Sequence, residues 1–306
     1  MNIKIDRMGR VLKILTVFTP TYNRAYTLHK CYESLKRQTS KDFIWLIIDD
    51  GSTDNTKEIV DKWISENEVE IRYYYQKNMG MHGAHNIAYE LIDTEINTCI
   101  DSDDYMTDDA VEKIVDFWNK NRYRGLAGFV ALDAYESGQI IGTQLPSNIN
   151  ETKYFDIYNT LGVKGDKKFI YRSDLTKLYP YPIFEGEKYV SLAYKYAKLD
   201  DNYKLGLMNE VVCIVEYMED GSSLNMFKQY RKNPKGFAFI RIENMKNPRI
   251  SAKGKFKECI HYVSSSIMAK NKRFLNDVPC KVITLMAIPF GVALYIYILK
   301  KTTDIK

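Results

Sequence analysis

The sequence lacks the features of an exported or zinc-stabilised protein. Residues 1–10 are charged and contain no apolar core, so we expect a flexible leader there and no export signal. No C-x-x-C pair occurs, and the cysteines are odd in number and far apart: Cys31, Cys99, Cys213, Cys259 and Cys280. This spacing predicts neither a zinc knuckle nor a disulfide framework, and it indicates a reducing cytoplasm.

Internal repeats, low-complexity segments and a strong net charge are also absent. The composition, 45% hydrophobic and 27% charged, is that of a folded protein and excludes wholesale disorder. The formal charge of +5 is too small to indicate nucleic-acid binding. Many basic residues lie late in the chain, within 228–257 and 270–301. They predict either a basic surface resting on an anionic membrane or an ordinary solvated face.

Long apolar runs are missing until residues 282–299, where an apolar segment lies between Lys281 and Lys300. A membrane span needs about 20 apolar residues, and Pro289 and Gly291 are tolerated in membrane helices. Three alternatives remain: a short span or re-entrant hairpin, an interfacial helix in the membrane plane, or a buried C-terminal helix. Because two of them involve a membrane, we expect peripheral contact through the C-terminus, at the inner, cytoplasmic face of the cell membrane.

The first half of the chain contains alternating strand-like and helix-like segments. Short apolar runs at 11–18, 43–48, 71–75 and 98–100 are separated by helical patterns. Such βαβ units predict a parallel sheet, whose ligands bind beyond the carboxyl ends of the strands.

Polar residues follow each of these four runs, at Thr19–Arg24, Asp49–Asp54, Asn78–Gly80 and Asp101–Asp104. Since parallel strands bring their carboxyl ends to one edge of the sheet, the four clusters predict a single binding site. A helix cap explains residues 52–54 equally well. It does not explain the Asp49-Asp50 pair, in which one carboxylate could accept a hydrogen bond from a nucleobase imide.

The acidic cluster Asp101-Ser102-Asp103-Asp104 allows two interpretations. Three carboxylates in four residues repel one another, and a divalent cation with the phosphates it carries would compensate them. Mg²⁺ and Mn²⁺ prefer oxygen ligands and usually combine one or two carboxylates with substrate phosphates. The alternative is a polar turn that caps the next helix, expected at 109–121. The other strand-end clusters favour the cation.

With these motifs in order, the chain resembles the family 2 glycosyltransferases of the GT-A fold. The matching segments lie at 19–24, 47–54, 78–86 and 101–104, and they cover about the first third of the chain. Four motifs in register are far more specific than one. The resemblance implies an α/β fold with a Rossmann-like, mostly parallel sheet flanked by helices. It also implies a nucleotide-diphosphate sugar donor, a Mn²⁺ or Mg²⁺ ion, and inversion at the anomeric carbon.

The resemblance assigns roles to residues at matching positions. Those expected to bind the donor are Pro20, Thr21, Tyr22, Arg24, Asp50, Asn78, Gly80, His82, Asn86, Asp101 and Ser102. Those expected at the metal are Asp103, Asp101 and Asp104, of which Asp104 could instead shape the loop. Asp50 would accept the imide N–H of the base, which favours a UDP-sugar, and His82 would face the diphosphate.

The resemblance also places the general base in the second half of the domain. A carboxylate must accept the proton of the attacking hydroxyl, and the matching segment reads Phe184-Glu185-Gly186-Glu187. Glu187 is the first choice and Glu185 the second. The alternative for Glu187 is that it caps the helix expected to begin near Lys188. The chain also departs from the family, with Leu192 and Ala193 where relatives often carry a second acidic residue.

These assignments give a domain plan. The catalytic domain would span 11–222, with a donor half at 11–121 and an acceptor half at 122–222, followed by a helical, basic region at 223–306. The acceptor would be a hydroxyl of a surface glycan or lipid-linked glycan. A sugar nucleotidyltransferase stays open as an alternative, although its Gly-rich phosphate loop is missing. So does a non-catalytic carbohydrate-binding or scaffold protein, although the intact acidic cluster argues against it.

Overall fold

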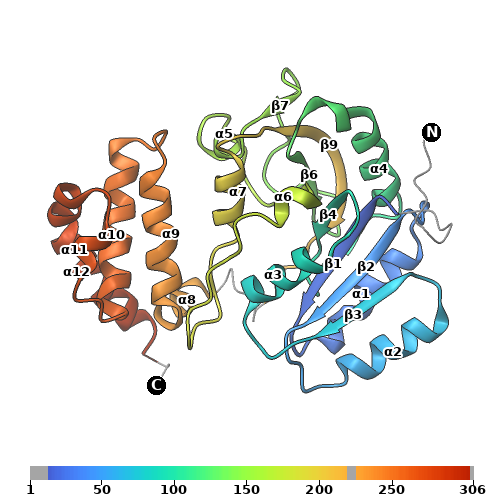
Figure 1. Cartoon of the computed structure of the whole chain (residues 1–306), viewed down its shortest axis with the longest axis horizontal. Helices are drawn as coiled ribbons and strands as arrows, with labels where there is room; N and C mark the ends of the chain where they lie inside the picture. The colour runs from blue at the N-terminus through green and yellow to red at the C-terminus, as the bar shows by residue number, and fades with distance from the viewer. Residues whose placement is uncertain (1–12, 219–224, 304–306) are drawn as a thin grey trace. The chain divides into compact units, whose positions relative to one another are not determined.

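The computed structural model describes residues 13–218 and 225–303 (Figure 1), so the leader predicted at 1–10 lies outside the described residues. The chain forms two compact units. The first takes the chain up to Asn78 and then Ala84–Pro180 and Lys195–Tyr217. The second takes Met79–Gly83, Tyr181–Tyr194 and the chain from Met218 onward.

The first unit is built on one nine-stranded sheet with the order β3-β2-β1-β4-β8-β6-β9-β5, and β7 pairs with β9. Its strands are β1 (Leu15–Thr21), β2 (Phe43–Asp49), β3 (Ile71–Tyr75), β4 (Ile96–Cys99), β5 (Tyr105–Met106), β6 (Gly128–Ala134), β7 (Glu151–Thr152), β8 (Lys167–Arg172) and β9 (Leu205–Ile214). Strands β1 to β4 pair in parallel, as do β6 and β9. The other pairings are antiparallel but involve fewer residues. The mostly parallel sheet predicted from the sequence is confirmed.

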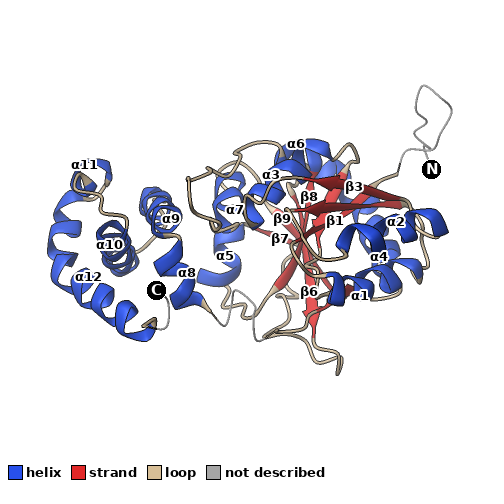
Figure 2. Ribbon diagram, turned by 90° about the horizontal axis from the view of Figure 1, so that it is seen from below, coloured by secondary structure: helices blue, strands red, loops and turns tan. Residues whose placement is uncertain are grey.

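Helices cover both faces of this sheet (Figure 2). Helices α1 (Ala25–Lys36), α2 (Thr56–Glu66) and α4 (Ala110–Asn121) lie on one face, and α3 (Met81–Leu91) and α6 (Ser173–Thr176) lie on the other. Strand β1 shows why both faces need cover, because its residues alternate between them. Leu15 and Val17 join the core under α1, α2 and α4, whereas the ring of Phe18 meets His85 of α3 at 5.0 Å. The remaining helices of this half of the chain are η1 (Arg122–Arg124), α5 (Tyr154–Asn159) and α7 (Ala193–Leu199).

The second unit is mainly helical, as predicted for the C-terminal region. Its helices are α8 (Met226–Lys232), α9 (Pro234–Lys246), α10 (Ala252–Met268), α11 (Phe274–Asp277) and α12 (Lys281–Lys301). Helices α8 and α9 are separate, because the chain breaks at Asn233 between Lys232 and Pro234. Proline lacks the amide hydrogen that a helix interior needs but fits the first helical position.

Helix α12 contains the apolar run predicted at 282–299. Within the described residues it is the one helix long and apolar enough to cross a membrane, with 21 residues and a mean hydropathy of 2.3. Only 22% of that apolar stretch is buried. The alternative of a buried C-terminal helix is therefore wrong.

Candidate functional site

The strand-end clusters meet at one edge of the sheet, as the sequence predicted. Backbone hydrogen bonds continue past the strand ends, from Asp50 N–H to the Thr21 carbonyl (2.8 Å) and from Ile100 N–H to the Phe18 carbonyl (3.0 Å). Gln76 N–H likewise donates to the Asp49 carbonyl (2.9 Å). The loops after β1, β2, β3 and β4 therefore leave the sheet side by side.

The loops after β1 and β2 are held together by polar contacts. Asn23 donates its N–H to Ser52 Oγ (2.9 Å) and accepts from Thr53 N–H through Oδ1 (2.7 Å). Its φ of 52° is a left-handed conformation that asparagine adopts more readily than most residues. These contacts hold the loop that presents the half-exposed ring of Tyr22. One side of the Tyr22 ring is therefore accessible for stacking on a flat base.

Asp54 supports the helix-cap interpretation of residues 52–54. Its carboxylate accepts hydrogen bonds from Thr56 N–H (3.1 Å) and from Ala25 N–H at the start of α1 (3.1 Å). Burial alone would raise the pKa of Asp54, but the hydrogen bonds from Thr56 and Ala25 lower it. Asp54 therefore joins the loop after β2 to the start of α1.

The carboxylates of the Asp49-Asp50 pair are both buried but have different partners. Asp49 accepts from Ser52 N–H (2.7 Å) and from the Tyr73 hydroxyl (2.6 Å), which uses both of its oxygens inside the protein. Asp50 Oδ1 accepts from Gln76 Nε2 at 2.7 Å. The sequence reasoning missed Gln76, although its position directly after β3 and two residues before Asn78 was a usable signal.

The acidic cluster forms a tight turn. Asp104 N–H donates to the Asp101 carbonyl (3.0 Å), and the Cys31 thiol of α1 donates to the Asp104 carbonyl (2.9 Å). Asp101 is exposed and Asp103 half-buried, whereas Ser102 and Asp104 are buried. Only Asp101 and Asp103 thus present their carboxylates toward solvent.

Asp104 lies at the centre of a buried charge cluster that the sequence reasoning did not find. Its carboxylate is 4.0 Å from Lys168 Nζ and accepts from Glu216 N–H (3.3 Å), and the same ammonium is 3.9 Å from Asp133. Burial raises the pKa of Asp104 to about 8 and that of Asp133 to about 6, with Lys168 opposing both shifts. This geometry favours the loop-shaping role for Asp104. The signal in the sequence was a charged residue within each of two apolar strands, Lys168 in β8 and Asp133 in β6.

The residues at this edge fit a divalent ion only together with a phosphate ligand. Among the described residues, no group of three His, Cys, Asp or Glu side chains could hold a metal. Asp101 and Asp103 remain as hard oxygen donors, and Mg²⁺ or Mn²⁺ commonly binds through one or two carboxylates plus substrate phosphates. A diphosphate would complete the coordination.

Other predicted residues divide between the units: Asn78 and Asn86 lie in the first, and Gly80 and His82 in the second. At Gly80 (φ +81°) a Cβ would lie 2.1 Å from the Lys188 carbonyl oxygen, so only glycine fits. Burial lowers the pKa of His82 to about 4, although the Lys188 backbone favours the charged form. His82 is therefore neutral at pH 7, and it supplies no positive charge for a diphosphate.

Glu187 caps a helix, but not the one expected to begin near Lys188, because residues 188–192 are not helical. Its two carboxylate oxygens accept the backbone N–H groups of Lys235 and Gly236, each at 2.8 Å, at the start of α9. Helix N-termini favour such a carboxylate because their first amides lack partners within the helix. Glu185 lies on an exposed turn beside Gly186, and among the described residues its side chain makes no ion pair or hydrogen bond.

The family described as glycosyl transferase family 2 matches residues 16–179, more than half of the chain. The chain belongs to this glycosyltransferase family. The matched part includes the strand-end loops from Thr19 to Asp104, as well as Asp133 and Lys168 of the buried cluster. It ends before Glu185 and Glu187.

Relatives of this family 2 glycosyltransferase include far longer proteins. Glycosyltransferase GlyA of Streptococcus pneumoniae is 30% identical over 216 residues, which are 65% of this chain and 29% of that protein. A teichoic acid poly(glycerol phosphate) polymerase of Staphylococcus epidermidis is 33% identical over 106 residues, 34% of this chain and 15% of that protein. The chain thus matches less than a third of either relative.

A solved structure confirms the fold class. S. aureus TarS 1–349, in complex with UDP-GlcNAc, is similar with a TM-score of 0.62 at 18% identity. The similarity covers 95% of this chain and 92% of that one. At this identity the likeness concerns the fold, and it agrees with the predicted GT-A architecture.

Proposed function

We propose that this family 2 glycosyltransferase transfers a sugar from a UDP-sugar to a hydroxyl of a surface glycan or lipid-linked acceptor, with inversion at the anomeric carbon. The observation that carries the proposal is the arrangement of Asp50 beside the loop of Tyr22, with Gln76 fixing its carboxylate. Asp50 would accept the uracil N–H and Tyr22 would stack on the ring. The UDP-GlcNAc complex of TarS and the teichoic acid polymerase among the relatives support this donor and acceptor class.

In this proposal Asp101 and Asp103 hold a Mn²⁺ or Mg²⁺ ion that, when bound, stabilises the negative charge of the departing diphosphate as a Lewis acid. The chain contributes the position of these carboxylates. Lys168 and the Cys31 thiol hold Asp104 and thereby the whole turn. The backbone of the turn then fixes the positions of Asp101 and Asp103.

We assign the general base to Glu185. Proton abstraction needs a carboxylate whose oxygens are not already used by the protein, and Glu187 uses both of its oxygens on the amides of α9. Such a base contributes roughly 10²–10⁴-fold to the rate. His82, being neutral, would donate at most an uncharged hydrogen bond to the donor.

We also place the protein at the inner face of the cell membrane, with peripheral contact through its C-terminal helices. The apolar, poorly buried helix α12 supports this location. It would bring the catalytic unit close to a membrane-linked glycan acceptor.

A donor screen tests the proposed chemistry. Thermal unfolding is measured with UDP- and GDP-sugars, with and without Mn²⁺, and donor hydrolysis is followed in the same samples. We expect a UDP-sugar to raise the Tm only with Mn²⁺ present, and Asp103→Ala to abolish both this shift and hydrolysis. Asp116→Ala, an exposed aspartate of α4, is the matched control and should behave as the wild type. A protein that no nucleotide sugar stabilises under either condition would contradict the proposal.

A further inference from the structure

Helix α12 buries its small residues and exposes its large apolar ones, the reverse of a helix in the core of a water-soluble protein. Its buried residues are small, namely Thr284, Ala287 and Gly291, with Ile298 near the end. Its large apolar side chains face outward, with exposed fractions of 70% for Val282, 51% for Leu285, 57% for Met286 and 56% for Phe290. Contiguous exposed apolar surface of this kind marks a site covered by a partner or a lipid.

The helical region that carries this surface is strongly basic. Residues 225–303 contain 16 Lys and Arg but only three Asp and Glu, whereas the whole chain has a formal charge of only +5. The rest of the chain is therefore net acidic. The charge of the helical region favours an anionic partner. The exposed apolar side chains of α12 favour a partner that also has an apolar part.

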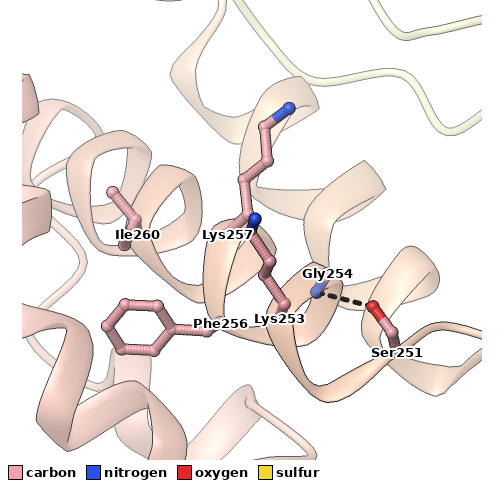
Figure 3. A pocket seen from close by; sticks show the side chains of 6 residues that line it. All are labelled: Ser251, Lys253, Gly254, Phe256, Lys257 and Ile260. Carbon is pink, nitrogen blue, oxygen red and sulfur yellow. Dashed lines mark hydrogen bonds between the residues drawn. The ribbon is translucent and has the colours of Figure 1, made fainter.

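Basic side chains lie directly beside the apolar surface. A shallow hollow on α10 is lined by Lys253, Phe256, Lys257 and Ile260 together with Ser251 and Gly254. Figure 3 shows both lysine side chains extending to the same side of the helix, with Phe256 and Ile260 next to them. The Phe256 ring meets the Phe290 ring of α12, with centroids 5.6 Å apart. The hollow and the outward face of α12 thus form one amphipathic surface.

We propose that this surface, formed by the outward face of α12 and the Lys253 and Lys257 side of α10, docks in the plane of a bilayer that contains anionic phospholipids. The apolar side chains would enter the boundary between headgroups and acyl chains, and the lysines would pair with lipid phosphates. Nucleic acid satisfies the charge but offers no apolar layer for Leu285, Met286 and Phe290.

The packing of α12 against α10 opposes a membrane span. A Cβ at Gly291 would lie 2.5 Å from Val263, and the Thr284 hydroxyl donates to Cys259 Sγ (3.4 Å), so the two helices are tightly joined. The first half of α10 carries Lys253 and Lys257, and Glu258 of the same stretch pairs with Arg241 at 3.1 Å. If α12 crossed the bilayer, the first half of α10, which is joined to it, would also lie in the hydrocarbon layer. Charged side chains are strongly disfavoured there.

This inference rests on the membrane contact of the proposed function and is independent of the transfer chemistry. The full chain is floated with vesicles of phosphatidylcholine alone or mixed with phosphatidylglycerol, at low and high NaCl. We expect binding to the mixed vesicles only, weakened by salt. Since each lysine near an anionic surface is worth roughly a fivefold change in partitioning, Lys253→Glu with Lys257→Glu should reduce binding by about 25-fold or more.

Matched variants separate surface chemistry from unfolding. Leu285→Gln with Met286→Gln should also reduce binding by about tenfold. The controls are Lys120→Glu with Lys177→Glu and Ile64→Gln with Leu178→Gln, exposed pairs of the first unit, which should bind as the wild type. Circular dichroism of each variant confirms that it is folded.

Three results would overturn the proposal: equal binding to neutral vesicles, retention of the protein in the membrane after carbonate extraction, or a dimer that L285Q/M286Q dissociates without any vesicle binding. The second would indicate a span and the third a second copy of the chain. The Tm shift with a UDP-sugar in vesicle-free solution tells these failures apart from failure of the transferase proposal.

Discussion

At the scale of single residues, neighbouring acids of this chain have opposite tasks. Asp49 uses its carboxylate to hold Ser52 and Tyr73, while Asp50 is oriented by Gln76. Glu187 caps α9, while Glu185 stays exposed two positions away. In the second pair the residue with both oxygens bound to backbone amides is structural, and its exposed neighbour Glu185 is the candidate for chemistry.

Gln76 offers a first test at this scale. Gln76→Ala removes the hydrogen bond from Gln76 Nε2 to Asp50, and hydrogen bonds to charged groups contribute about 1.5–3 kcal/mol. We expect UDP affinity to fall by about tenfold, as measured by calorimetry. Gln139→Ala, an exposed glutamine, is the control, and unchanged UDP affinity in Gln76→Ala would contradict the positioning role.

The two glutamates give a second test. Glu185→Gln should lower kcat by about 10²–10⁴-fold with little change in Tm, because it removes the base and no structural contact. Glu187→Ala should instead lower the free energy of unfolding by about 2 kcal/mol, because two amides of α9 lose their acceptor. Steady-state kinetics and thermal unfolding of both variants check the assignment. Full activity in Glu185→Gln would remove that residue as the base.

At the scale of elements, the contact of α12 with α10 depends on the absence of a side chain at Gly291. Ala is preferred over Gly in a helix by about 1 kcal/mol, so a simple helix would be stabilised by Gly291→Ala. Here the added Cβ would lie 2.5 Å from Val263, and overpacking commonly costs about 1–3 kcal/mol.

We therefore expect Gly291→Ala to lower the stability of the full chain in chemical denaturation. Ala293→Leu, on the exposed side of α12, adds more volume and should be tolerated. If Gly291→Ala raises the stability, the two helices are not packed as closely as described.

At the scale of the whole molecule, the buried His82 and the half-buried His261 make stability depend on pH. Burial lowers the pKa of His82 and of His261 to about 4, compared with about 6.5 in an unfolded chain. Each therefore contributes stability that is present above about pH 6.5 and is lost as the pH falls toward 4.

The free energy of unfolding of the His261→Gln variant should fall less than that of the wild type between pH 7 and pH 4. Allowing for the partial exposure of the ring, the difference is about 1 kcal/mol, or about 2 °C in Tm. Thermal unfolding across this range measures it, with His29→Gln, an exposed histidine of α1, as the control. Parallel pH profiles for all three proteins would rule out His261 as a source of acid sensitivity.

The sequence by itself determined the alternation of strands and helices and the polar residues at the strand ends, because these follow from hydrophobic periodicity and local turn chemistry. The family came from the resemblance of four motifs in order. Tertiary structure alone decided which acids are bound inside the protein. Glu187 meets Lys235 from 48 positions away, Asp104 meets Lys168, and Gly291 meets Val263. Such contacts join segments that are distant along the chain. No local sequence pattern therefore shows which carboxylate or which helix face will take part in them.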